Sequence, residues 1–334
     1  MTRDPSSRRK WLRRAIKLLI AAAVLWWVHG TLYDGWIELK KHDRGQWQWQ
    51  PGWLAVAGGL YLLGLLPFCL FWHRVLKTLG QQARLAETIR AYYIGHLGKY
   101  VPGKAMVVVI RAGLIRSHRV ATGVAAVSVL LETLTMMAVG AFVAAAYLAL
   151  FFHEKPLWSW AAGGLMVVSL VPTLPSVFRR LVRLAGVGKS DPQTAEKIGR
   201  FGFKTLLLGW LLSLIGWAIL GLSYWATLRA MGIEGLDPVG HLPRYVAGVA
   251  LAVVAGFLLL VLPAGLGVRE AFLIELTLPY LKELGRGFED PAAWASAVAV
   301  AAAVLLRLVW TVSESLISGI LWFCKPRPRP GDPL

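Results

Sequence analysis

Charged residues are scarce in this sequence. Only 16% of its 334 residues are Asp, Glu, Lys or Arg, whereas about 25% is usual for soluble domains. Hydrophobic residues make up 57%, and several apolar runs reach the roughly 20 residues that cross a hydrocarbon core of about 30 Å. These features exclude an ordinary soluble domain and predict an all-α integral membrane protein.

Cysteines and familiar catalytic motifs are also scarce. The two cysteines, Cys69 and Cys324, form neither a CxxC pair nor a metal-ligand cluster. The patterns GxSxG, HExxH and the P-loop are absent. We therefore expect no metal, no cofactor and no catalytic residues, and an enzyme is less expected than a transporter. Acid–base pairs within the bilayer keep an enzymatic role open.

Positive charge, in contrast, is in excess, with 36 Lys and Arg against 18 Asp and Glu. On a soluble protein a net charge of +18 would suggest nucleic acid. Here the basic residues fall in blocks between apolar runs, as the positive-inside rule requires, so we expect no nucleic-acid partner. The pattern predicts a bacterial-type inner-membrane protein with both termini cytoplasmic, ending in a basic, Pro-rich tail at 324–334.

The apolar runs predict about six full spans and two interrupted segments. The spans are at about 12–30, 53–72, 119–152, 157–178, 205–230 and 292–323. The segments 85–116 and 245–284 are broken by Pro and Gly, which interrupt helices, and neither half of 85–116 can span a bilayer. We expect two re-entrant hairpins, because irregular backbone at membrane depth must be buried in protein or line a watery cavity.

The order of these segments repeats. Residues 12–152 and 157–323 each contain two spans, a broken hairpin and a long span with a buried charge. The first repeat starts inside and the second outside, which predicts two inverted repeats within one transmembrane domain, 1–334. Inverted repeats with broken helices near the midplane are typical of many transporters. The alternative is that evenly spaced helices and two Pro-Gly breaks coincide by chance.

Three ionisable residues lie well inside predicted spans. They are Glu132, Arg307 and Glu314, and such a side chain costs about 2.5–3.5 kcal/mol at the bilayer centre on insertion scales. We expect them to form an intramembrane polar network that lines or gates a pathway. The alternative is a structural ion pair between Arg307 and Glu314, which are seven residues apart and share one helix face.

The residues around the two breaks form a candidate head-group site. Free amide groups at a helix N-terminus favour an anion, and Arg adds a bidentate fork for phosphate. The predicted substrate-binding residues are Lys99, Pro102, Gly103, Lys104, Arg111, Pro263, Gly265, Gly267, Arg269 and Glu270. The alternative for the basic residues is snorkelling to interfacial lipid phosphates, and Glu270 could simply neutralise Arg269.

These motifs resemble a known family. The segment Leu97 to Gly103 with Arg111 and Leu114, the segment Leu262 to Ala271, and Leu306-Arg307-Leu308 with Glu314 resemble signatures of the lysylphosphatidylglycerol synthase/flippase membrane-domain family, over about residues 12–323. Ala264 departs from the usual Gly, and Lys104-Ala105-Met106 stands where many relatives are Gly-rich. The resemblance implies the flippase-like half alone, without the soluble synthase domain.

The expected function is movement of a lipid. We expect a flippase or scramblase that moves an anionic phospholipid or a lipid-linked glycan across the inner membrane, with a membrane lipid as its partner. An integral-membrane enzyme that modifies a lipid head group and a non-transporting scaffold are the alternatives. No feature of the sequence indicates an oligomeric state.

Overall fold

The computed structural model describes residues 26, 30, 33, 48–101, 105–117, 120–151, 164, 167, 170–184, 201–258 and 267–324. Within these residues the regular structure is helical, apart from one isolated bridge between Ser117 and Val120. The all-α prediction is confirmed for this part of the chain.

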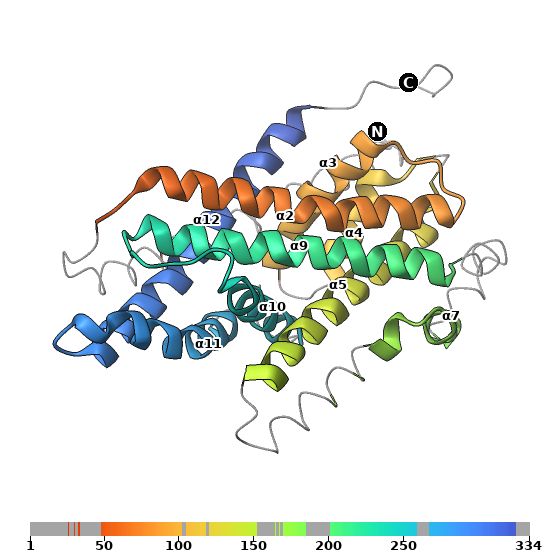
Figure 1. The fold of residues 1–334 in the computed structure, drawn as a ribbon. Coiled ribbons are helices and arrows are strands. Elements are labelled where there is room, and N and C mark those ends of the chain that lie inside the picture. The colour runs from red at the N-terminus through yellow and green to blue at the C-terminus, as the bar shows by residue number, and fades with distance from the viewer. Residues whose placement is uncertain are drawn as a thin grey trace.

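Four long helices form the frame of the molecule (Figure 1). They are α2 (Pro51–Thr78), α5 (Thr122–Phe151), α9 (Phe203–Ala230) and α12 (Pro291–Phe323). At 1.5 Å per residue they are about 42 to 50 Å long, more than the hydrocarbon core requires, and all four are apolar enough to cross a membrane. They coincide with four of the six predicted spans.

The two interrupted segments form pairs of shorter helices. The first pair is α3 (Leu85–His96), extended by the 3-10 turn η1 (Leu97–Tyr100), and α4 (Ala105–Ile115). The second is α10 (Leu242–Leu258) and α11 (Val268–Leu284), and the members of each pair pack against each other. Helices α3 and α4 are each under about 20 Å long. Their re-entrant placement in a membrane stays a prediction.

The predicted span at 157–178 is wrong at its C-terminal end. The 3-10 turn η2 (Val171–Thr173) is followed by Leu174 in an extended conformation, and a separate helix α7 (Pro175–Leu184) begins there. The helix is interrupted because the ring of Pro175 disfavours helical geometry at Leu174. The rest of this span and the span at 12–30 lie outside the described residues apart from isolated positions, so six spans stays a prediction.

The two halves of the chain pack reciprocally. Helices α2 and α9 lie side by side along much of their length (Figure 1). Helix α3 of the first half packs against α12 of the second, and α10 of the second half packs against α5 of the first. Helices α4 and α11 each pack against the long helix that follows them. Two related repeats would produce this pattern, in which a short helix of each half packs against a long helix of the other half. The inverted repeats themselves stay a prediction.

Glycines let α2 and α9 approach closely. A Cβ atom on Gly216 would lie 2.6 Å from the Phe68 ring and 3.0 Å from the carbonyl oxygen of Gly64. A Cβ on Gly64 would lie 2.8 Å from a methyl carbon of Leu220. Helices in membranes commonly associate through small residues at such contacts, because lipid provides no hydrophobic driving force for their association.

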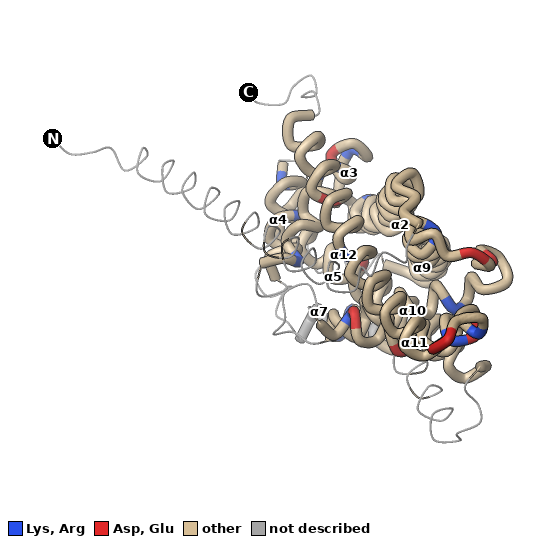
Figure 2. The backbone as a smooth tube through the Cα atoms, turned by 90° about the vertical axis from the view of Figure 1, so that its left-hand side faces the viewer, with Lys and Arg blue, Asp and Glu red and all other residues tan. Residues whose placement is uncertain are grey.

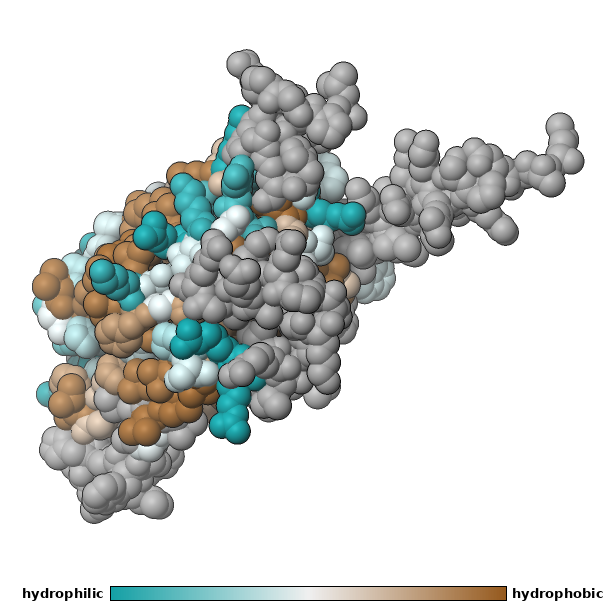
Figure 3. Space-filling model, turned by 90° about the vertical axis from the view of Figure 1, so that its right-hand side faces the viewer, coloured by the Kyte–Doolittle hydropathy of each residue, from teal (hydrophilic) through white to brown (hydrophobic). Residues whose placement is uncertain are grey.

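The outer surface is suited to lipid rather than water. Helix α9 exposes a stripe of large apolar side chains, namely Phe203, Leu207, Leu211, Leu214 and Ile215. Figure 3 shows large apolar areas on the described surface, and Figure 2 shows the long helices with few charges along them. An exposed apolar surface of this extent is typical of a membrane-contacting surface, whereas in water it promotes aggregation.

The close approach of η1 to α4 gives a stability prediction. A Cβ on Gly98 would lie 2.8 Å from the backbone nitrogen of Val107 and 2.9 Å from its Cα, whereas Gly113 on α4 has open space around it. We expect Gly98→Ala to destabilise the protein by about 1–3 kcal/mol through overpacking, and Gly113→Ala to stabilise it by up to about 1 kcal/mol. Thermal unfolding in detergent measures both, and equal melting temperatures would contradict the prediction.

Candidate functional site

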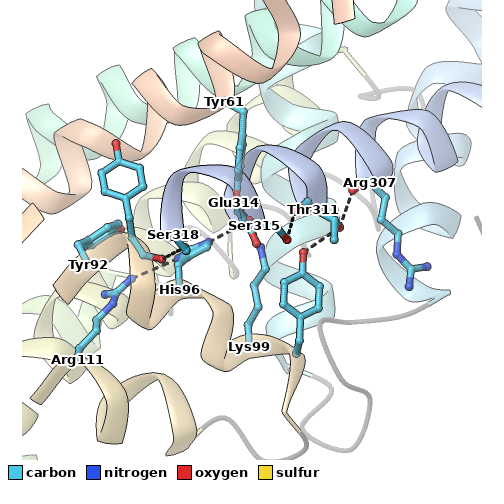
Figure 4. A network of polar contacts seen from close by, with 12 residues as sticks. Tyr61, Tyr92, His96, Lys99, Arg111, Arg307, Thr311, Glu314, Ser315 and Ser318 are labelled. Atoms are coloured by element: carbon cyan, nitrogen blue, oxygen red, sulfur yellow. Dashed lines mark hydrogen bonds and ion pairs between the residues drawn. The ribbon is translucent and has the colours of Figure 1, made fainter. Parts of the chain in front are cut away.

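The interior holds a group of charged side chains contributed by both halves of the chain (Figure 4). The two short-helix pairs supply basic residues from η1, α4 and α11, and the long helices α5 and α12 supply two buried glutamates, Glu132 and Glu314, both 1% exposed. Such buried charges persist in a low-dielectric interior when each is paired and hydrogen-bonded.

The first ion pair joins α4 to α5. Arg111 Nη1 donates to Glu132 Oε2 at 2.7 Å, with side-chain exposures of 3% and 1%. The hydroxyl of Tyr92 donates to Glu132 Oε1 at 3.1 Å, and the Arg111 guanidinium lies 3.8 Å from the centre of the Tyr92 ring. Gly95 on α3 leaves the room for this arginine, because a Cβ there would lie 2.3 Å from Arg111 Cγ. The pair is fully enclosed by protein.

The second acidic centre is Glu314 on α12. Its Oε1 atom accepts hydrogen bonds from the Tyr61 hydroxyl of α2 and from the Lys99 ammonium of η1. His96 Nε2 of α3 lies 3.7 Å from the same oxygen. Glu314 therefore ties α12 to α2 and to the continuous segment of α3 and η1, which lie far apart in the sequence.

His96 connects the two centres. Its Nδ1 atom lies 3.3 Å from Arg111 Nη2, while its Nε2 atom faces Glu314 (Figure 4). A continuous set of polar contacts thus runs from Glu132 through Arg111 and His96 to Glu314 and Lys99.

A small cavity lies beside this network, between η1, α10, α11 and α12. Its volume of about 40 Å³ has room for a few water molecules. The polar and aromatic side chains that line it are Lys99, Tyr100, Arg269, Glu270, Arg307, Trp310 and Thr311. Apolar residues of α10, α11 and α12 form the rest of the described wall.

Two arginines of the cavity are held differently. Arg307 Nη1 donates to Glu270 Oε1 at 3.4 Å. Arg269 lies over the Trp310 ring, 5.4 Å from its centre, and no carboxylate of the described residues lies within ion-pairing distance of it. A cation–π contact leaves the positive charge without a counter-anion, so this guanidinium is available to an anion.

Most of the predicted residues fall into three groups. Lys99, Arg269, Glu270 and Arg307 meet at the cavity, although Arg307 was predicted for the polar network. Arg111 lies inside α4 rather than at its N-terminus, pairs with Glu132 and is not part of the described lining. Pro102, Gly103, Lys104, Pro263 and Gly265 lie outside the described residues.

Two expected pairings of charged residues differ from those in the structure. The alternative of an ion pair between Arg307 and Glu314 is wrong: Arg307 pairs with Glu270 and Glu314 with Lys99. The reason is distance, since seven residues correspond to about 10 Å along a helix axis. The suggestion that Glu270 neutralises Arg269 is also wrong, because its partner is Arg307.

Gly267 has a role that the structure describes. Its φ is +78°, a left-handed value, and it immediately precedes the first residue of α11. A residue with a Cβ is disfavoured in this conformation. Gly267 therefore sets the direction in which α11 starts, and with it the placement of Arg269 and Glu270 at the cavity.

Sequence reasoning missed the tyrosines. Tyr61 and Tyr92 contact the buried glutamates, and the Tyr100 hydroxyl lies 2.9 Å from the Thr311 hydroxyl. Tyr61 also stacks on Trp310, with ring centres 4.4 Å apart. A weak signal for them existed: each tyrosine occurs within or beside an apolar run, where a hydroxyl needs a partner.

The comparison with protein families matches this picture. The sequence profile described as "Lysylphosphatidylglycerol synthase TM region" matches residues 14–317. The chain belongs to this family. It is therefore a multi-pass membrane protein of a lipid-associated family, related to lipid modification or translocation. A search of curated proteins found no match.

Metal chemistry has no visible site in the described part of the family domain. No three His, Cys, Asp or Glu side chains among the described residues lie close enough together to hold a metal ion. The two cysteines are free, with Cys69 buried and Cys324 exposed.

Proposed function

We propose that this protein moves a lipid with an anionic head group, a phospholipid or a lipid-linked glycan, across a bacterial-type inner membrane. Its head group would pass through the cavity between η1, α10, α11 and α12, while the acyl chains stay in the bilayer. Family membership supports a link to lipids, and the charges of the cavity support the anionic head group.

The observation that carries the proposal is the charge balance of the cavity. Lys99, Arg269 and Arg307 bring three positive charges, and Glu270 and Glu314 bring two negative ones to the ion pairs of Arg307 and Lys99. Arg269 is the unmatched charge among these residues. A guanidinium binds phosphate through parallel hydrogen bonds, so an anionic head group would neutralise the remaining positive charge of Arg269.

The size of the cavity adds a condition. At about 40 Å³ it accommodates a few waters and is too small for a phospholipid head group. Entry of a lipid therefore requires η1 and α11, which come from different helix pairs, to move apart. Rocking of one half of a repeat transporter against the other is a common way to produce such an opening.

The proposal is tested with purified protein in vesicles of phosphatidylcholine containing a trace of fluorescent phosphatidylglycerol. Bleaching with externally added dithionite reports the lipid that reaches the outer leaflet. We expect bleaching to go beyond the roughly half of the signal that protein-free vesicles lose. A covalently changed lipid would instead indicate an enzyme, and bleaching equal to that of protein-free vesicles would favour a scaffold.

A further inference from the structure

The two carboxylate oxygens of Glu314 are in different situations. Oε1 accepts hydrogen bonds from Tyr61 and Lys99 and faces His96 Nε2, whereas Oε2 is buried and has no hydrogen-bond partner. Buried carboxylate oxygens are normally hydrogen-bonded. A proton can therefore be added at Oε2 without breaking any contact that Glu314 makes.

Lys99 stands between Glu314 and the cavity. Its ammonium contacts Glu314, yet its side chain is 20% exposed and lines the cavity. It also lies 5.2 Å from the centre of the Tyr100 ring. Two anions can compete for this ammonium: the carboxylate of Glu314 behind it and an anionic head group in front of it.

We propose that Glu314 takes up a proton when an anionic head group enters the cavity, so that proton binding and lipid binding are coupled. This inference rests on the proposed function, because it takes the head-group site as given. Protonation neutralises Glu314 and releases Lys99 to the ligand, and the total charge of the buried site is kept. By linkage each of the two ligands, proton and head group, strengthens the binding of the other.

The proton has a route. Lys99, which contacts the Glu314 carboxylate, transfers one of its protons to that carboxylate and takes a replacement from a hydronium ion in the cavity, which leaves as water. The lysine ends as an ammonium and the glutamate as a neutral acid, so the step adds one proton to the protein. Because proton and lipid then occupy the site together, a proton gradient would drive the lipid in the same direction as the proton.

His96 is a poorer acceptor for this proton. An arginine can only donate hydrogen bonds, so Nδ1 of His96 accepts the bond from Arg111 Nη2 and the ring proton sits on Nε2, facing Glu314. A second ring proton would have to replace the lone pair that accepts from Arg111 and would face that cation at 3.3 Å. The imidazole therefore orients toward Glu314 as a neutral donor.

The other described elements packed against α12 add no competing acid close to Glu314. The titratable or charged groups that face it are Tyr61 of α2, His96 of α3, Lys99 and Tyr100 of η1, and Arg269 of α11, which lies over Trp310. Glu270 of α11 is occupied by Arg307, and α9 contributes the uncharged Ser223, which accepts from Trp310. Glu314 is thus the carboxylate that shares Lys99 with the cavity.

The test is isothermal titration of the full chain in detergent with dihexanoylphosphatidylglycerol. Repeating it in buffers of different ionisation enthalpy counts the protons taken up on binding. For the natural protein we expect about one proton, and an affinity that weakens up to tenfold per pH unit as pH rises. Glu314→Gln, which is permanently neutral, is expected to take up none and to bind with little pH dependence.

Matched variants keep the result interpretable. Glu314→Asp retains an ionisable group and is expected to keep the proton uptake, and His96→Gln is expected to keep it as well. Glu283→Gln, at an exposed glutamate with 59% side-chain exposure, should behave like the natural protein. Melting temperatures show which variants are folded, and the aspartate and histidine variants decide the question if Glu314→Gln is not.

The outcomes separate the two proposals. Lipid binding without proton uptake, or with an uptake that survives Glu314→Gln, overturns the coupling and leaves the lipid site standing. Loss of uptake in His96→Gln together with retention in Glu314→Gln assigns the proton to the histidine and also overturns it. No binding at any pH contradicts the proposed function, and the coupling with it.

Discussion

Replacing Arg111 with leucine is expected to lower the free energy of unfolding by about 3–5 kcal/mol. The substitution leaves the Glu132 carboxylate, 1% exposed, without its 2.7 Å partner. Among the described side chains only the hydroxyls of Tyr92 and Thr133 would then hydrogen-bond this enclosed charge. A loss of this size is a large fraction of the 5–15 kcal/mol that stabilises typical proteins, so the variant should express poorly and melt much earlier.

Two comparison variants make this prediction specific. The double variant Arg111→Leu with Glu132→Leu removes both charges and should recover most of the lost stability, because a neutral pair avoids the desolvation cost. Arg286→Leu breaks an exposed ion pair, with side-chain exposures of 77% and 59%, and should cost less than about 1 kcal/mol. Unfolding in mixed detergent measures all three, and a cost for Arg111→Leu as small as that of Arg286→Leu would refute the prediction.

Replacing Arg269 with glutamine is expected to weaken binding of an anionic lipid by about 10- to 100-fold, which corresponds to the 1.5–3 kcal/mol of a charge-assisted hydrogen bond. No protein carboxylate of the described residues loses a partner in this variant. The effect should therefore fall on the ligand, with little change in the free energy of unfolding. Arg111→Leu is thus expected to reduce stability, whereas Arg269→Gln is expected to reduce lipid binding.

The measurement for Arg269 is titration with a short-chain phosphatidylglycerol in detergent, together with the melting temperature. Arg269→Lys should bind with intermediate affinity, since it keeps the charge and loses the bidentate fork. Arg286→Gln, which removes an exposed arginine outside the cavity, is the matched control. Equal affinities for Arg269→Gln and this control would contradict the proposal that Arg269 binds the head group.

Much of the helical framework was readable from hydropathy. The four long helices begin and end within about six residues of the predicted spans, because a run of apolar residues that must satisfy its own backbone hydrogen bonds has no alternative to a helix. The end of η1 at Val101 and the start of α11 after Gly267 could be predicted for a similar reason, since Pro and Gly disfavour helix geometry. The 3-10 turn before Pro175 was missed although Pro172 and Pro175 carry the same signal, because most of the surrounding residues are apolar.

The partners of the charged residues could not be predicted from the sequence. Arg111 and Arg269 both follow a predicted break and look equivalent in the sequence, yet Arg111 is sealed against Glu132 and Arg269 borders the cavity. The difference arises from the approach of α4 to α3 and α5, where Gly95 leaves space for the Arg111 side chain. Such contacts depend on residues distant in the sequence.

The sequence by itself determined the class of protein, the main apolar helices and the small set of charged residues at which function is sought, because these depend on local composition and on the cost of charge in a bilayer. Only the tertiary structure decided that Glu314 pairs with Lys99 and Glu270 with Arg307, that tyrosines complete the network, and that Arg269 is left to the cavity. Pairing is a matter of a few ångströms between elements such as η1 and α12, 215 residues apart at Lys99 and Glu314, and helix packing sets that distance.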